Sequence, residues 1–345
     1  MGKKLLEVKD LSVSFNTYAG EVQALRGINF SVDRGETLAI VGESGSGKSV
    51  TVQTIMRLIP MPPGEIKNGE ILFDGEDLVK ASPERMRELR GGKIGMIFQD
   101  PMTSLNPTIK VGKQIMEGIL IHKKVTKEEA KQKAVEMLRK VGIPKPEERF
   151  HQYPHEFSGG MRQRAVIAIA LSCEPDLLIC DEPTTALDVT IQAQILDLIN
   201  ELKKELNIAV ILITHDLGVV AETADRVVVM YAGEKLEEAP VRELFKNPKH
   251  PYTWGLLKSL PRLDMKIGEK LASIPGTPPD LLKPPAGDPF AARSEYAMKI
   301  DYERKPPMID LGNGHLVKSW LYVDGAPKVK SPFEQEVDNR EEEGK

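Results

Sequence analysis

Hydrophobic and polar positions alternate along the first forty residues in the way that β-strands require. Residues 5–15 (LLEVKDLSVSF) and 28–32 (INFSV) form short alternating runs, and Asp33-Arg34-Gly35 forms a turn before residues 37–43 (TLAIVGE). This order predicts an antiparallel hairpin between the last two runs, with its second strand leading into a glycine-rich loop. A helical pattern follows at 48–59 and stops before Pro60.

The middle of the chain mixes strands with charged helices. Residues 69–78 and 93–100 have the pattern of strands, and a charged helix is expected near 83–90. Residues 108–143 are helical in period and rich in charge, and their amphipathic pattern ends at Gly142.

From residue 158 onward helical and strand patterns alternate regularly. Helices are predicted at 159–171, 190–206 and 217–224, and apolar strands at 176–183, 208–216 and 226–234. Continuous apolar strands between helices indicate a buried parallel sheet with helices on both faces. The fold class is therefore α/β.

Composition argues against several classes of protein, namely nucleic-acid binders, secreted proteins and membrane-spanning proteins. The chain has 345 residues, 28% of them charged and 5% aromatic, with a net charge of -4, which argues against a nucleic-acid binder. Cys173 and Cys180 lie in apolar stretches, where cysteine usually acts as a small buried hydrophobe, and a reducing compartment fits. The N-terminus lacks the apolar run of a signal peptide, and no run reaches the roughly 18–20 apolar residues of a membrane span.

The glycine-rich loop carries the first chemical signal. It fits the pattern GxxxxGK[ST], in which glycines let backbone N–H groups and the following helix N-terminus face phosphate oxygens. Lys48 would place a positive charge at the β- and γ-phosphates, and the Ser49 hydroxyl would ligate Mg²⁺. The loop consists of Gly42, Glu43, Ser44, Gly45, Ser46, Gly47, Lys48 and Ser49.

Two adjacent carboxylates end the predicted strand at 177–180. Asp181 and Glu182 would lie at the carboxyl edge of the sheet, where open α/β sheets bind ligands. Next to a phosphate loop, Asp181 would hold the Mg²⁺ shell, and Glu182 would orient or deprotonate the attacking water. Without that loop, the same pair would more often be a helix cap or a solvated turn.

Gln99, His215 and the segment Ser158-Gly159-Gly160 are ordinary when each is taken alone. Gln99 and His215 follow predicted strands, and by themselves they would pass as a surface glutamine and a structural histidine. Ser158 is a suitable N-cap, and the glycines behind it leave helix N–H groups accessible to an anion. One nucleotide needs only one phosphate-binding loop from its own chain. This second potential anion-binding site, at residues 158–160, therefore suggests that it binds the nucleotide of a partner molecule.

Taken together, these motifs resemble those of the ABC-type ATPases. The family order is present within residues 5–235: Walker A at 42–49, the Q-loop at Gln99, the signature FSGGM at 157–161, Walker B at 177–182, the D-loop at 186–188 and the H-loop at His215. The signature departs from the commoner LSGGQ but keeps the serine and both glycines. The resemblance implies an ABC-type P-loop nucleotide-binding domain with a parallel core sheet, an antiparallel β element and a helical subdomain.

The resemblance also implies how nucleotide would be bound. Two chains would pair head-to-tail and hold ATP between each Walker A loop and the opposite signature, with His215 at the γ-phosphate and Gln99 near Mg²⁺ and water. Val50 and Asp188 are expected to contribute to the nucleotide site. The adenine would stack on Phe15, which aligns by strand register, or on Tyr18, and both alternatives stay open.

A closer resemblance is to the oligopeptide/dipeptide permease branch of importers. It rests on residues 98–107 (FQDPMTSLNP), 152–164, 181–196 and 247–261 (NPKHPYTWGLLKSLP), and it extends over about 4–330. It implies an ATP-hydrolysing subunit at the cytoplasmic face of the membrane that pairs with a sister ATPase or a second copy and docks on two membrane-spanning permease subunits. A separate binding protein would deliver the peptide to those subunits from outside. Nickel or oligosaccharide import is an alternative. A soluble ABC ATPase acting on ribosomes or DNA fits less well, because the chain lacks a second nucleotide domain.

The C-terminal part departs from that branch. Its extension commonly holds an iron–sulfur cluster on four cysteines, and the corresponding positions here are Asp288, Ser294, Asp301 and Ser319. Such clusters need soft thiolate ligands, so we predict no cluster. Oxygen ligation of another metal by Asp288 and Asp301 is an alternative, and packing at Phe290, Trp320 and Tyr322 is the preferred explanation.

The expected domains follow from these motifs. Residues 1–255 would form the nucleotide-binding domain, with the helical subdomain at about 108–160. Residues 256–330 would form the C-terminal extension, and residues 331–345 a flexible acidic tail.

Overall fold

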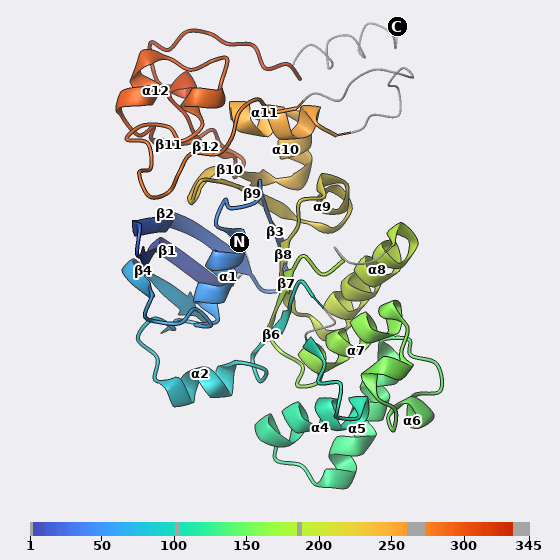
Figure 1. Cartoon of the computed structure of the whole chain (residues 1–345). Coiled ribbons are helices and arrows are strands. Elements are labelled where there is room, and N and C mark those ends of the chain that lie inside the picture. Colours follow the sequence, from blue (N-terminus) through green and yellow to red (C-terminus); the bar gives the residue numbers. More distant parts are fainter. Residues whose placement is uncertain (1–2, 101–103, 185–187, 261–272, 334–345) are drawn as a thin grey trace, which may run out of the picture.

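Two β-sheets organise the molecule (Figure 1). The computed structural model describes residues 3–100, 104–184, 188–260 and 273–333. The smaller sheet is antiparallel, in the order β2-β1-β4-β5. Its strands are β1 (Lys4–Thr17), β2 (Gly20–Asp33), β4 (Gly64–Phe73) and β5 (Glu76–Asp77).

The predicted hairpin between residues 28–32 and 37–43 is wrong. The hairpin joins β1 to β2, with Thr17 opposite Gly20, whereas β3 (Thr37–Val41) lies in the larger sheet between β8 and β9. The physical reason is burial, because all five residues of β3 are buried. A strand that is apolar at every position gains most in a parallel sheet covered on both faces.

The larger sheet has the order β11-β12-β10-β9-β3-β8-β7-β6. The five strands from β9 to β6 run parallel, as the alternating pattern predicted. They are β9 (Arg226–Tyr231), β3, β8 (Ala209–Ile213), β7 (Leu177–Asp181) and β6 (Ile94–Ile97). The sheet then continues antiparallel through β10 (Glu234–Pro240), β12 (Leu316–Lys318) and β11 (Met308–Asp310).

Successive residues of the parallel strands point into different cores. Leu178 and Leu212 face a cluster with α7 (Gly159–Leu171) and α8 (Val189–Leu206), whereas Leu177 and Ile211 face a cluster with α1 (Lys48–Ile55) and the small sheet. This burial of both faces explains why the strands are apolar at every position.

The helical run predicted at 108–143 is two helices. They are α4 (Val111–His122) and α5 (Lys127–Lys140), and the second begins at a capping box formed by Thr126 and Glu129. Further along lie α6 (Pro146–Arg149) and the 3-10 turn η1 (Pro154–Glu156). The charged helix expected near 83–90 is α2 (Pro83–Leu89). In Figure 1, α4–α6 lie at the end of the molecule opposite the C-terminal elements.

The C-terminal elements pack on the edge of the large sheet and extend it (Figure 1). Lys305 and Lys318 pair with Glu234 of β10, whose side chain is buried. The elements are α10 (Val241–Lys246), α11 (Pro251–Lys258), η2 (Ala291–Arg293), α12 (Lys299–Glu303) and η3 (Trp320–Tyr322). The short helix α9 (Leu217–Thr223) comes earlier in the chain, between β8 and β9. Most of the predicted acidic tail, residues 334–345, lies outside the described residues. Among the described helices, none combines the length and apolar character that a membrane span requires.

Candidate functional site

The glycine-rich loop 42–49 connects β3 to α1, as the sequence predicted. Gly42 has φ +150°, and a Cβ there would meet the carbonyl oxygen of Met230 at 2.1 Å, so no side chain fits. Gly45 and Gly47 also have positive φ values, of 77° and 100°. L-residues rarely adopt this backbone, which explains why the loop needs glycine.

Lys48 lies inside the loop and is almost fully buried. Its Nζ donates to the carbonyl oxygens of Gly42, at 2.7 Å, and Glu43, at 2.9 Å. Burial lowers the pKa of Lys48, and the carboxylates of Glu182 and Asp181 partly oppose that effect. An ammonium group has three N–H donors, so these two bonds leave one for an anion at the loop.

The side chains of Ser49 and Asp181 are in contact next to the loop. The Ser49 hydroxyl donates to Oδ1 of Asp181 at 3.0 Å, and Asp181 is the last residue of the buried strand β7. Burial raises the pKa of Asp181, and the Ser49 hydrogen bond opposes the rise. A hydroxyl and a carboxylate are hard oxygen donors of the kind that Mg²⁺ prefers, so these two residues fit the predicted metal site.

Glu182 is contacted by both of the other predicted catalytic residues. The side-chain nitrogen of Gln99 donates to its Oε2 at 2.9 Å, and Nδ1 of His215 lies 3.6 Å from its Oε1. Gln99, Glu182 and His215 follow the adjacent parallel strands β6, β7 and β8, whose carboxyl ends share one edge of the sheet. Sheet topology therefore brings together three residues that are distant in sequence.

The backbone of Glu182 is unusual. Its φ is +49°, in the left-handed region that non-glycine residues rarely adopt, and its N–H donates to the carbonyl oxygen of Ile213 at 3.0 Å. Backbone strain of this kind clusters at functional sites. The conformation aims the carboxylate between Gln99 and His215.

The second predicted anion-binding site, at residues 158–160, lies at the N-terminus of α7, where Ser158 is the N-cap. The Ser158 hydroxyl accepts from the N–H of Met161 at 3.3 Å and caps α7. A Cβ at Gly159 would meet nothing within 4 Å, so the space beside it is open, whereas one at Gly160 would approach Ile191. Nothing within the described part of this chain therefore requires glycine at 159.

The remaining predicted nucleotide contacts are spread around the loop. Asp188 caps α8 by accepting from the N–H of Ile191 at 3.0 Å, whereas Ala186 and Leu187 of the D-loop lie outside the described residues. Ser44 is exposed, Val50 is half-buried, and the hydroxyl of the buried Ser46 has no hydrogen-bond partner.

The two adenine candidates differ in exposure. Phe15 is partly buried against the small-sheet core, and Tyr18 at the β1–β2 turn is fully exposed. The choice between them stays open.

Two residues next to the loop, Arg293 and Tyr252, were not predicted. Arg293 donates to both carboxylate oxygens of Glu43, and the Tyr252 hydroxyl accepts from the Glu43 N–H at 2.8 Å. Arg293 is 250 residues from Glu43. No pattern within one segment of the sequence indicated this contact, since the loop motif accepts any residue at position 43.

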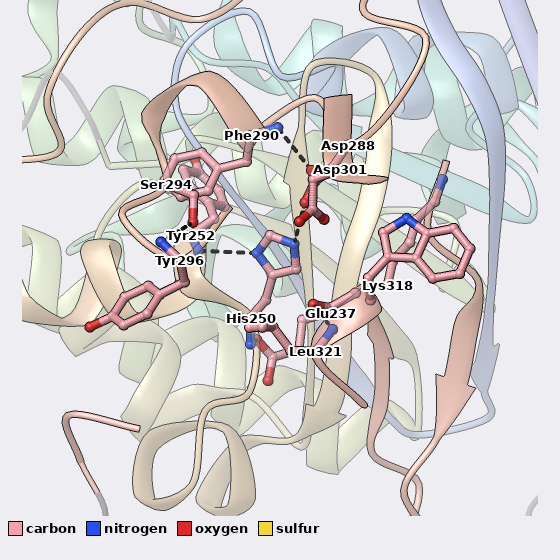
Figure 2. Close-up of polar contacts among 12 residues, drawn as sticks. Glu237, His250, Tyr252, Asp288, Phe290, Ser294, Tyr296, Asp301, Lys318 and Leu321 are labelled. Carbon is pink, nitrogen blue, oxygen red and sulfur yellow. Dashed lines mark hydrogen bonds and ion pairs between the residues drawn. The ribbon is translucent and has the colours of Figure 1, made fainter. Parts of the chain in front are cut away.

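The four positions aligned with cluster cysteines each accept a backbone N–H. Oδ1 of Asp288 accepts from Phe290 at 2.9 Å, and Oδ2 of Asp301 accepts from Met298 at 2.7 Å. The hydroxyls of Ser294 and Ser319 accept from Tyr296 and Leu321, both at 3.2 Å; Figure 2 shows this region. These oxygen atoms therefore hold the local backbone directly.

His250 lies among these residues and is fully buried. Its Nδ1 accepts from the N–H of Tyr252 at 3.0 Å, and its Nε2 points toward Oδ2 of Asp288 at 3.7 Å (Figure 2). Burial raises the pKa of Asp301, and the neighbouring Asp288 adds to the rise. With no thiolate in this set, the residues do not fit an iron–sulfur cluster. Over the described ranges, no group of three or more His, Cys, Asp or Glu side chains is arranged to hold a metal ion.

Two family models match the chain. The ABC transporter model covers residues 25–185, and the model described as the oligopeptide/dipeptide transporter C-terminal region covers residues 236–300. The chain is 65% identical to the oligopeptide transport ATP-binding protein OppD of Bacillus subtilis, over 95% of this chain and 92% of that protein. It is 55% identical to the dipeptide transport ATP-binding protein DppD of Lactococcus lactis, over 95% of this chain and 93% of that protein.

Solved structures agree with the fold. The dimeric post-hydrolysis state of the ATP-binding cassette MJ0796, bound to ADP and Pi, superposes with a TM-score of 0.61 at 26% identity, covering 69% of this chain and 99% of that one. The structure of cbiO1 from Clostridium perfringens has the same TM-score at 32% identity, covering 71% of this chain and 91% of that one.

Proposed function

The chain belongs to the family of ABC transporter ATP-binding proteins that act in oligopeptide and dipeptide transport, and we propose that it couples ATP hydrolysis at a dimer interface to peptide import. It is an ABC-type ATPase with a mixed α/β fold. The observation that carries the mechanism is the convergence of Gln99 and His215 on Glu182.

Each residue of the site has a distinct proposed role in hydrolysis. Lys48 and the N–H groups of the loop bind the β- and γ-phosphates. Glu182 orients a water molecule toward the γ-phosphorus and takes its proton as the bond to ADP breaks. Gln99 holds the Glu182 carboxylate in place and contacts the water, and His215 donates to the γ-phosphate. The products are ADP and inorganic phosphate.

Ser49, Asp181 and Gln99 are the residues that would hold Mg²⁺. The 3.0 Å contact between Ser49 and Asp181 supports this set. Bound Mg²⁺ neutralises charge that develops on the phosphate oxygens.

The second half of each site is proposed to come from a partner chain. Ser158, Gly159 and Gly160 would receive the γ-phosphate bound by the opposite Walker A loop, and the open space beside Gly159 supports this role. Asp188 would lie at the same interface. Because ATP contacts both chains, its binding favours the closed pair, and hydrolysis removes that preference. The partner is a sister ATPase or a second copy.

The chain is membrane-associated, as an importer's ATP-binding subunit must be. We place it at the cytoplasmic face of the membrane, bound to two permease subunits, with an external binding protein delivering the cargo. The helical subdomain at about 108–160 is the proposed contact with the permease. The names of the relatives favour peptides over the alternative cargoes nickel and oligosaccharides.

The C-terminal extension is proposed to work without an iron–sulfur cluster. The backbone hydrogen bonds made by Asp288, Ser294, Asp301 and Ser319 support this proposal, because they satisfy the positions that would otherwise be ligands. The domain limits of 1–255 and 256–330 belong to the same proposal.

Uptake in cells tests the whole function. A strain lacking this gene is expected to lose uptake of a radiolabelled tripeptide and to survive a toxic dipeptide. Wild-type protein restores both phenotypes, whereas Lys48→Ala does not, because it removes the charge that binds the phosphates.

Labelled nickel and a labelled oligosaccharide serve as cargo controls in the same strain. Loss of uptake of either one, with peptide uptake unchanged, would contradict the peptide assignment. If Lys48→Ala restored uptake fully, ATP binding at this loop would not drive import.

A further inference from the structure

Glu43, within the phosphate-binding loop, is held by an arginine of the C-terminal extension. Nη1 of Arg293 lies 2.7 Å from Oε2 of Glu43, and Nη2 lies 3.1 Å from Oε1. The Arg293 side chain is 7% exposed and that of Glu43 is 26% exposed. A two-point contact of this kind fixes orientation as well as distance.

Every N–H donor of the Arg293 guanidinium has a partner. Besides Glu43, Nη1 donates to the Tyr231 hydroxyl at 3.0 Å, Nε to the carbonyl oxygen of Pro275 at 2.7 Å, and Nη2 to that of Ile274 at 3.3 Å. A guanidinium has five N–H donors, so none is left over. Burial opposes its charge, but Glu43 and Tyr231 outweigh that effect and raise the pKa of Arg293.

The position of Arg293 is set by the extension. The residue ends η2, a turn whose start is held by the hydrogen bond from Phe290 N–H to Asp288. The guanidinium also lies over the rings of Tyr231 and Phe290, at 5.6 and 5.9 Å from their centroids. These contacts fix the arginine independently of the loop.

The backbone of Glu43 has a second anchor. Its N–H donates to the hydroxyl of Tyr252, a fully buried residue of α11. The Tyr252 ring packs against Tyr231 at a centroid distance of 4.6 Å. The carbonyl oxygen of Glu43 accepts from Lys48. Residue 43 therefore links the extension to the lysine that faces the phosphates.

A negatively charged glutamate at position 43 makes binding of a polyphosphate less favourable. Its negative charge lies in a loop whose ligand is a polyphosphate, and like charges a few ångströms apart repel strongly where water is partly excluded. Arg293 neutralises that charge and holds the carboxylate against the extension. Without Arg293, the free carboxylate would repel the nucleotide.

We propose that Arg293 is a positioning residue for the phosphate-binding loop, through which the C-terminal extension sets the affinity of the site for ATP. This inference rests on the proposed role of residues 42–49 in binding phosphate. It assigns the extension a function in the ATPase site itself, in addition to its packing on the sheet.

The test compares Arg293→Ala, Glu43→Gln and the double variant in ATPase assays and in binding of a fluorescent ATP analogue. Arg293→Ala is expected to raise KM and the analogue's Kd at least about fivefold while changing kcat little. Glu43→Gln weakens the contact with Arg293 but also removes the negative charge, so its Kd should rise less than that of Arg293→Ala. The double variant recovers most of the lost affinity, because no unpaired carboxylate remains.

Two further variants complete the design. Lys305→Ala removes another ion pair between the extension and the sheet without touching the loop, and it should leave affinity unchanged. Arg293→Lys keeps the charge but loses the two-point contact, so it gives an intermediate Kd. It provides the measurement if Arg293→Ala does not fold.

Failure of this proposal and failure of the phosphate-loop assignment give different results. Wild-type affinity in Arg293→Ala, or in Arg293→Lys where the alanine variant does not fold, overturns the proposal, as does equal weakening of the single and double variants. A Lys48→Ala variant that also binds ATP normally would instead overturn the phosphate-loop assignment.

Discussion

The side-chain nitrogen of Gln99 donates a hydrogen bond of 2.9 Å to Oε2 of Glu182, across 83 residues of sequence. The bond joins the ends of two adjacent parallel strands, β6 and β7. It holds the carboxylate at the edge of the sheet where the phosphate-binding loop begins. Four predictions concern this site and its surroundings.

Glu182→Gln is expected to lower kcat by roughly 10²–10⁴-fold, because the amide cannot accept a proton from water. ATP binding should persist, since Lys48 and the loop N–H groups are unchanged. Phosphate release measures turnover, and size-exclusion chromatography with ATP and Mg²⁺ measures trapped pairs. Glu201→Gln, an exposed position on α8, is the control. Full activity of Glu182→Gln would refute the proposed base.

Ser158→Arg is expected to abolish ATP-dependent pairing while leaving ATP binding by the single chain unchanged. The proposed contact of Ser158 is with the partner's nucleotide, and within its own chain the hydroxyl caps α7. Analogue binding at low protein concentration and light scattering at high concentration separate the two effects. Lys48→Ala should instead weaken ATP binding by the single chain itself, by roughly 10–100-fold. Normal pairing of Ser158→Arg would contradict the two-sided site.

Only one of Phe15→Ala and Tyr18→Ala is expected to weaken ATP binding, by roughly 5–150-fold, which is the usual contribution of an aromatic side chain stacked on a base. Tripolyphosphate has no base, so its affinity should not change in either variant. Isothermal titration with both ligands measures the difference. If neither variant alters ATP affinity, the adenine stacks elsewhere.

Asp301→Asn is expected to raise thermal stability near neutral pH. Burial raises the pKa of Asp301 above its ordinary value of 3.8, so the folded chain binds this proton more tightly than the unfolded chain. The wild type therefore loses stability as pH rises above about 4, and the neutral asparagine avoids that loss. The gain in Tm should shrink toward pH 4.

Asp310→Asn is the matched control for that measurement. Asp310 is exposed, and its Oδ1 accepts from Gly312 N–H in a similar local turn. It should show no comparable gain in Tm near neutral pH. An Asp301→Asn gain that did not change with pH would indicate that charge burial is not its cause.

The parallel sheet and the residues of the phosphate-binding loop could be predicted because their signals are local. An apolar strand with no polar face must be covered on both sides, and a loop that wraps phosphate needs glycine at fixed positions. The positive φ values of Gly42, Gly45 and Gly47 agree with that requirement. The same reasoning placed Asp181 and Glu182 at a strand end.

The hairpin prediction failed because a short turn does not determine which sheet a strand joins. Asp33-Arg34-Gly35 form a turn, but the two strands beside it diverge into different sheets. The sheet that a strand joins depends on how much of its surface each sheet can bury, compared across all the strands. β3 is buried more completely than β2, and it lies in the larger sheet.

The sequence by itself indicated the proposed chemistry of the site, namely which residues would hold phosphate, ligate magnesium and orient water, since those capacities depend on residue type and spacing. Tertiary structure alone decided which distant residues meet. The contact of Arg293 with Glu43 has no local signal, because it depends on how α11 and the 3-10 turn η2 pack against β9. Packing acts between elements far apart in the chain, and no pattern within one segment records it.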